Sequence, residues 1–129
     1  MPELNPWAVV VAAIASFAAA AAYYAVFGRQ LAEFRGTAGG QPPAWLVPIV
    51  ELGKGLVIAF VFAWLAAIGE LAGWTDGALL GLALWAAFPV MLLISSVVHE
   101  SVSWKLAGLH AGDWLVKLVL IAVIVVVWR

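Results

Sequence analysis

The stretch GALLGLALWAAFPVMLLISSVV, residues 77–98, contains no charged side chain from end to end. A helix needs about 20 mostly apolar residues to cross the hydrocarbon core of a bilayer, and this stretch has that length. Its apolar character is continuous, whereas a strand of a membrane barrel alternates between apolar and polar residues. We therefore predict that this part of the chain forms a transmembrane helix.

Three other stretches of the chain have the same apolar character. Because no Lys or Arg precedes the first of them, we interpret it as a retained helix and not as a secretory signal peptide. The longest predicted connection contains the breakers Gly39-Gly40 and Pro42-Pro43. The expected transmembrane helices cover residues 7–27, 45–69, 76–98 and 104–128, each to within a few positions.

The composition agrees with a chain that folds in lipid. Of the 129 residues, 67% are hydrophobic and 10% are charged, whereas soluble domains are about half apolar and about a quarter charged. A net charge of −1 gives no basic surface for nucleic acid, and the chain contains no cysteine. We expect one all-α domain over residues 1–129, a polytopic membrane protein with a four-transmembrane-helix bundle and the lipid bilayer as its surroundings.

The positive charges indicate the orientation. Arg29 and Arg35 lie in the predicted first connection, and Lys105 begins the last helix, whereas residues 71–76 contain no Lys or Arg. Short cytoplasmic loops carry an excess of such residues, so both termini are expected to face outside. The frequent Ala, Gly and Trp residues indicate the plasma (inner) membrane of a bacterium.

Two further features concern how the helices pack. Pro89 lies in the middle of the third predicted helix and is expected to kink it. Gly77 and Gly81 are four residues apart, as are Gly108 and Gly112, and such pairs allow helices to approach closely in membranes. The pairs predict packing inside one bundle or, alternatively, a face for a dimer.

Four charged residues inside the predicted helices form the main candidate site: Glu51, Lys54, Asp113 and Lys117. Each costs about 2.5–3.5 kcal/mol at the centre of a membrane helix, so they should face the bundle interior and pair. Counted along the helices from Trp45 and Trp104, Lys54 and Asp113 lie at one depth, which predicts that they pair. Asp113 and Lys117 also have the i, i+4 spacing of an ion pair.

Three further ionisable residues are expected at the cytoplasmic mouth of this cluster: His99, Glu100 and His110. Glu51 and His110 lie at the same predicted depth, which predicts a second pair between helices. His99, Glu100, His110 and Asp113 are also ligand types for a divalent cation, but no HExxH-like pattern accompanies them. We therefore predict no metal site and no cofactor.

Parts of the sequence match the pattern of a known family. The carrying stretches are YYAVFG at residues 23–28, GLALWAAFP at 81–89 and ESVSWKLAGLHAGDWLVK at 100–117. They resemble a family of small bacterial membrane proteins catalogued as domain of unknown function seventeen-sixty-one. The resemblance implies four membrane helices, and it implies no activity.

The chain departs from that family pattern at three positions of the last helix. His110 stands where the family usually has Asn, and Asp113 stands where an aromatic residue or His is usual. Lys117 is not a position that the pattern marks. Asp113 and Lys117 therefore look particular to this chain, so the charged cluster is not expected to be a device shared across the family.

Two hypotheses about function follow from these patterns. Small size, short loops and the lack of a catalytic motif favour a non-enzymatic membrane protein, either an accessory subunit of a membrane-protein partner or a small homo-oligomer. The alternative is a minimal transporter or a proton or ion relay that uses the buried charges, because ionisable residues inside membranes are often functional. A tight, dry cluster would favour the first hypothesis, and an open polar cavity would favour the second.

Overall fold

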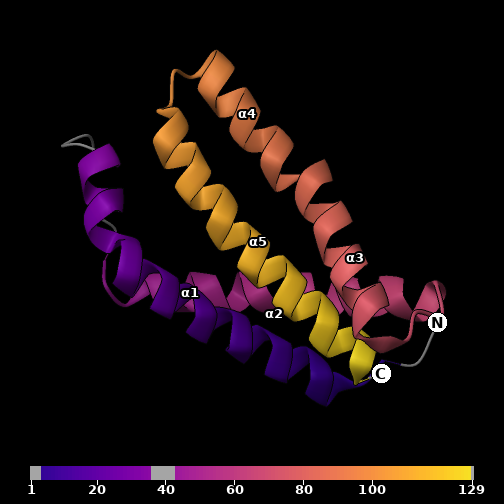
Figure 1. The fold of residues 1–129 in the computed structure, drawn as a ribbon. Helices are drawn as coiled ribbons and strands as arrows, with labels where there is room; N and C mark the ends of the chain where they lie inside the picture. Colours follow the sequence, from indigo (N-terminus) through magenta and orange to yellow (C-terminus); the bar gives the residue numbers. More distant parts are fainter. Residues whose placement is uncertain (1–3, 36–42, 129) are drawn as a thin grey trace.

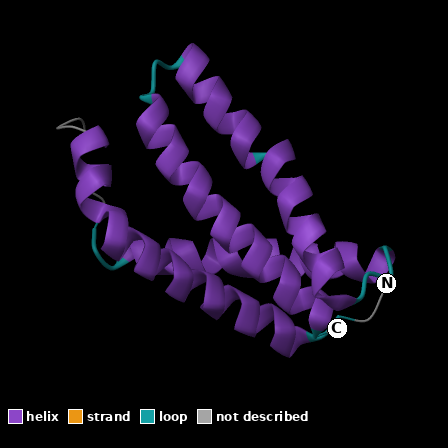
Figure 2. Cartoon of the chain, viewed as in Figure 1, coloured by secondary structure: helices purple, strands orange, loops and turns teal. Residues whose placement is uncertain are grey.

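The computed structural model describes residues 4–35 and 43–128, with the side chains of residues 31–35 left undescribed. Within these ranges every regular element is a helix, as Figure 2 shows. The elements are α1 (Pro6–Arg35), α2 (Leu46–Ile68), α3 (Gly73–Ala87), α4 (Pro89–His99) and α5 (Trp104–Val127). This arrangement confirms the predicted all-α class.

Four spans in the described ranges are long and apolar enough to cross a membrane. They are Pro6–Gln30, Leu46–Ile68, Gly73–His99, which joins α3 to α4, and Trp104–Val127. Many large apolar side chains on these spans point away from the bundle, which suits a surrounding of lipid. The fold is therefore that of a multi-pass membrane protein, as the sequence predicts.

Two helices extend beyond their predicted boundaries. The first helix does not end at residue 27 but continues to Arg35, because only Gly28 interrupts a run of helix-forming residues and one glycine costs about 1 kcal/mol. The third helix begins at Gly73, before the predicted start at 76. Its Asp76 carboxylate accepts a hydrogen bond from the Ala72 N–H at 3.2 Å. The breakers at 39–40 and Pro42 lie outside the described residues.

The predicted kink at Pro89 is confirmed. Helix α3 ends at Ala87, and Pro89 is the first residue of α4. Proline has no N–H for the carbonyl of Trp85 one turn earlier, and its ring would clash with that carbonyl in a straight helix. Phe88 at the break has φ −117° and ψ −73°. The kink changes the direction of the span, and no residue of α4 is buried.

Helix α5 is the central element of the bundle. In Figure 1 it lies between the α3–α4 span on one side and α1 and α2 on the other, and it packs against all of them. Ile121 and Val125 of α5 are the largest fully buried side chains, and they pack with small residues of the neighbours such as Ala12, Ala59 and Ala66. Close approach of backbones therefore builds this core.

The closest approach joins α3 to α5. A Cβ atom added at Gly77 would lie 2.8 Å from the Cα of Val123, and one at Gly81 would lie 2.7 Å from the Cα of Val119. The two glycines therefore serve packing inside the bundle, which was one of the two predicted roles. At Gly108, by contrast, an added Cβ would meet nothing within 4 Å.

Both ends of the described chain lie at the same end of the bundle, as Figure 1 shows. The Asn5 side-chain N–H donates a hydrogen bond to the carbonyl of Trp128 at 3.0 Å. The start of α5 at Trp104 lies at the opposite end. The prediction that the termini face outside concerns the membrane and is taken up below.

The packing of α3 on α5 makes a prediction about stability. Replacing Gly81 with Ala should lower the free energy of unfolding by about 1–3 kcal/mol, because the new methyl group meets backbone atoms that cannot rotate away. Gly108→Ala is the matched control and should raise the stability by up to about 1 kcal/mol, since its Cβ meets open space and alanine favours the helix. Thermal unfolding of both variants in detergent measures the difference. Equal midpoints would contradict the close α3–α5 contact.

Candidate functional site

An ion pair on the central helix forms the middle of the candidate site. Asp113 and Lys117 are both buried, with 2% and 6% of their surface exposed. The Nζ atom of Lys117 lies 2.9 Å from Oδ2 of Asp113, at the i, i+4 spacing that the sequence predicts. The pairing between these two residues is therefore confirmed.

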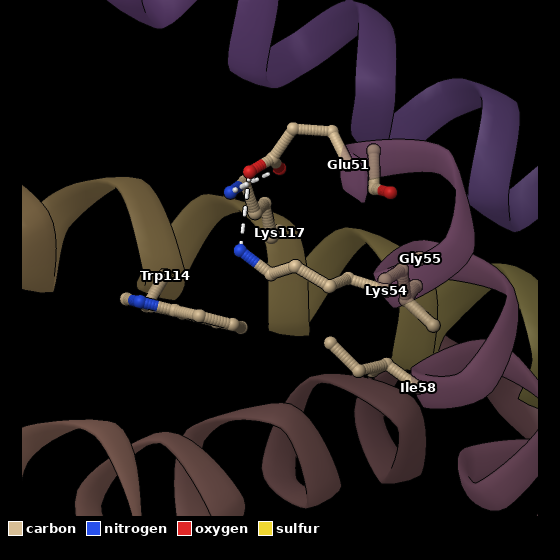
Figure 3. Close-up of a pocket in the computed structure, with 8 residues that line it drawn as sticks. Glu51, Lys54, Gly55, Ile58, Trp114 and Lys117 are labelled. Atoms are coloured by element: carbon tan, nitrogen blue, oxygen red, sulfur yellow. Dashed lines mark hydrogen bonds and ion pairs between the residues drawn. The ribbon is translucent and has the colours of Figure 1, made fainter. Parts of the chain in front are cut away.

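Glu51 extends the pair to a second helix. One of its carboxylate oxygens lies 3.1 Å from Nζ of Lys117, and the other lies 3.1 Å from Nζ of Lys54. Figure 3 shows dashed lines from Glu51 to both ammonium groups, so Glu51 joins α2 to α5. Two carboxylates and two ammonium groups give the cluster no net charge, which lowers the cost of placing it within the membrane.

Trp114 forms one side of the cluster. The ammonium groups of Lys54 and Lys117 lie 5.1 and 5.0 Å from the centre of its indole ring. Figure 3 shows this ring beside both lysines. A cation is attracted to the face of an indole, more strongly where water is excluded, so Trp114 stabilises both charges.

Both predicted pairs between helices are wrong. Glu51 binds Lys54 and Lys117 and not His110, which lies against Tyr24. Lys54 pairs with Glu51 of its own helix and not with Asp113, because residues three apart share one face of α2. The ion pair that crosses between helices is Glu51 with Lys117. Equal depth along the chain does not fix which way a side chain points around its helix, and the depth count could not separate the two pairings.

A tyrosine of α1 joins the cluster from a third helix. The Tyr24 hydroxyl donates a hydrogen bond to Oδ2 of Asp113 at 3.0 Å, and its oxygen lies 3.0 Å from Nδ1 of His110. A hydroxyl has one hydrogen, so with that hydrogen on Asp113 the His110 Nδ1–H is the donor to Tyr24. The polar row therefore runs His110, Tyr24, Asp113, Lys117, Glu51, Lys54.

Two further side chains bind backbone carbonyls of α5 near the cluster. The Tyr23 hydroxyl donates to the carbonyl of Leu109 at 2.6 Å, and the Trp85 indole N–H donates to the carbonyl of Ala111 at 2.8 Å. Gly112 makes room for Tyr23, because a Cβ added there would touch the hydroxyl. These bonds hold α1 and α3 against the same part of α5.

Sequence reasoning missed the aromatic members of the site: Tyr23, Tyr24, Trp85 and Trp114. The tyrosines carried a usable signal. Two consecutive hydroxyl groups inside an otherwise apolar membrane helix need hydrogen-bond partners, since lipid chains offer none. The two tryptophans carried no such signal, because tryptophan is also common where helices meet the membrane surface.

The predicted mouth residues separate into two groups. His110 lies against Tyr24 and belongs to the polar row. His99 and Glu100 lie exposed at the end of α4, and within the described ranges neither side chain makes a hydrogen bond or ion pair with the cluster. The position of these two residues relative to a cytoplasmic surface stays a prediction.

The space inside the cluster is small. A cavity of about 10 Å³ lies among the lysines, Glu51 and Trp114, with Ser16 of α1 on its border. This volume holds about one water molecule. The Oδ1 atom of Asp113 is buried and accepts no hydrogen bond from the described part of the chain. Over residues 4–35 and 43–128, no three His, Asp or Glu side chains gather closely enough to hold a metal ion.

Comparison with known proteins gives the family. The model of a family described as "Protein of unknown function (DUF1761)" matches residues 7–126. The chain belongs to this family. No curated protein and no solved structure matches it. Since the matched range covers all four apolar spans except Pro6 and Val127, the DUF1761 domain and the helix bundle are the same unit, as the resemblance implied.

The buried ion pair makes a prediction that does not depend on function. Asp113→Ala should lower the stability of this DUF1761 protein by about 3–5 kcal/mol, because it leaves the Lys117 ammonium buried with half of its partners. Glu100→Ala is the control and should change little, because that side chain is exposed. The midpoints of thermal unfolding in detergent compare the two. Equal shifts would show that the cluster does not hold the bundle together.

Proposed function

We propose that this chain is a non-enzymatic protein of the bacterial plasma membrane that works as an accessory subunit or as a small homo-oligomer. The observation that carries the proposal is the small space inside the cluster. The charges of the cluster balance, three helices meet in it, and its cavity of about 10 Å³ leaves no passage for a hydrated ion. Such a cluster fixes how α1, α2 and α5 fit together.

The core next to the cluster supports the same role. Along α5 beyond Lys117, the buried side chains are Leu118, Ile121, Ala122, Val125 and Val126, all of them apolar. A polar path across the membrane would need hydrogen-bonding groups in this half as well. The polar row is confined to one half of the bundle, where it holds α1, α2 and α5 together.

In the proposed orientation both termini face outside. The described chain ends meet through Asn5 and Trp128, so one assignment covers both of them. Arg29 on α1 and Lys105 at the start of α5 belong to the opposite end, and the excess of positive residues there supports a cytoplasmic location.

The first experiment is a purification from native membranes in a gentle detergent, followed by mass spectrometry of the intact particle. We expect either a stoichiometric second protein or a defined number of copies of this chain. A strictly monomeric particle without any partner would contradict the proposal. The identity of a stoichiometric partner would name the process in which the protein takes part.

A proton relay is the second candidate, and the continuous polar row from His110 to Lys54 favours it. A proton moves between hydrogen-bonded groups by exchange along the bonds, so it needs no open cavity. Neighbouring atoms in the row lie 2.9 to 3.1 Å apart. This candidate ranks second because the half of α5 beyond Lys117 is apolar and offers no groups to carry the proton further.

The two consecutive tyrosines allow a matched test of the relay. Tyr24→Phe removes the link between His110 and Asp113 and should slow proton movement about ten-fold or more. Tyr23→Phe removes a hydroxyl that binds backbone groups of α5 and is not a link in the polar row, and it should leave the rate unchanged. A pH-sensitive dye inside proteoliposomes measures both variants. If the unaltered protein moves no more protons than empty liposomes, the relay is rejected.

A further inference from the structure

An open apolar groove separates α2 from the α3–α4 span. Its volume is about 620 Å³, and α5 forms its floor with Trp114 and Leu118. Ile58 and Leu65 line one wall, and Phe88 and Leu92 line the other. The break at Pro89 lies within the second wall, so α4 borders the groove without burying a residue of its own.

The exposed face of α4 does not by itself indicate a partner. Phe88 and Leu92 are 61% and 69% exposed, and lipid chains would cover such side chains as well as protein would. The informative residues are the polar ones at the edge of the groove, because lipid chains cannot offer them a hydrogen bond.

Lys54 is the first of these polar residues. It precedes Ile58 by one turn of α2, so it lies on the face that lines the groove. Its side chain is 42% exposed although it lies inside the span Leu46–Ile68. An ammonium group has three N–H donors, and in the described structure Lys54 uses one of them, toward Glu51. Its ammonium group lies 5.1 Å from the ring of Trp114, which lines the groove, so the unused donors lie at that end of the groove.

Ser95 is the second polar residue. It follows Leu92 by three positions and lies on the same side of α4. Its neighbour Ser96 bonds the carbonyl of Leu92 within the helix, but in the described structure the Ser95 hydroxyl has no such bond and is exposed. A hydroxyl within a membrane helix gains stability by bonding to another helix.

Lys54 and Ser95 lie at similar depths on the two walls. The α2 helix and the α3–α4 span run in opposite directions, and Ile58 and Leu92 line the same groove. Lys54 precedes Ile58 by one turn, and Ser95 follows Leu92 by about one turn. Because the two elements are antiparallel, both residues lie toward the same end of the bundle. The chain thus carries an unused donor and an unused acceptor at one level.

We propose that two copies of this chain pair through α4, each placing its face of Phe88, Leu92 and Ser95 into the groove of the other. Ser95 of one copy then accepts a hydrogen bond from Lys54 of the second copy, and the reverse contact completes the pair. Such an arrangement has two-fold symmetry, so the contact closes on itself and forms a dimer. The inference rests on the homo-oligomer arm of the proposed function and names its surface.

The lack of cysteine makes the test direct, because each introduced cysteine is the only one in the chain. Leu92→Cys should form a disulfide-linked dimer when membranes are oxidised. Ile94→Cys is the matched control, because Ile94 is also exposed, at 51%. It follows Leu92 by two positions, so it lies on the opposite side of α4 and faces away from the groove. We expect a dimer on a non-reducing gel from the first variant and little from the second. Equal dimer formation by the two would overturn the proposal.

A second measurement tests the hydrogen bond and is independent of the cross-link. Lys54→Met should weaken the dimer about five-fold or more when the protein is diluted in detergent. Lys105→Met changes an exposed lysine at the start of α5 and should leave dissociation unchanged. Equal dissociation of the two variants would count against the Lys54–Ser95 contact and overturn the proposed pairing.

The outcomes also separate this proposal from the proposed function. If Leu92→Cys links to a different protein that co-purifies in fixed ratio, the protein is an accessory subunit and the dimer is rejected. If the purified particle is a monomer and the cysteine variant links to nothing, both proposals fail. If the protein is a homo-oligomer that cross-links through Ile94→Cys and not through Leu92→Cys, the proposed function stands and only the proposed contact surface on α4 is rejected.

Discussion

The rest of the structure depends on the burial of one ammonium group. Lys117 is 6% exposed near the middle of α5, where a charge costs about 2.5–3.5 kcal/mol in a membrane. Asp113 on the same helix provides one counter-charge, and Glu51 on α2 provides the other. Once Glu51 must reach Lys117, the relative position of α2 and α5 is set, and Tyr24 sets that of α1 through Asp113.

The two sides of α5 are held by different forces. On the side of α1 and α2, charged and hydroxyl groups meet in pairs, and the apolar core continues from them. On the side of α3, Gly77 and Gly81 bring backbones together, and the Trp85 indole N–H adds a hydrogen bond to the carbonyl of Ala111. The break at Pro89 ends this close packing, so α4 leaves a groove open beside the charged cluster. The small bundle thus has a tightly packed interior and an open groove, and the groove is the proposed contact with a second copy.

The sequence predicted the class of fold and most of the site. Runs of apolar residues longer than a bilayer is thick require helices, because an unpaired backbone is too costly in lipid. Ionisable residues in such runs must gather inside the bundle, so the apolar pattern alone was enough to single out Glu51, Lys54, Asp113 and Lys117. The kink followed from the ring of Pro89 alone. Each of these features is local or is forced by the solvent.

Only the tertiary structure decided which groups meet. Depth along a helix can be counted from sequence, but rotation around its axis cannot, and so the Lys54–Asp113 pair was wrong and Glu51–Lys117 holds the helices together. The part played by Tyr24 and Trp114 depends on how α1 and α5 face each other. Whether Gly77 and Gly81 pack inside one chain or between two depends on the position of α5. The apolar composition shows that the chain folds in lipid, and lipid by itself requires helices and buried charges. Which side chains pair depends on contacts that exist only once the helices are packed.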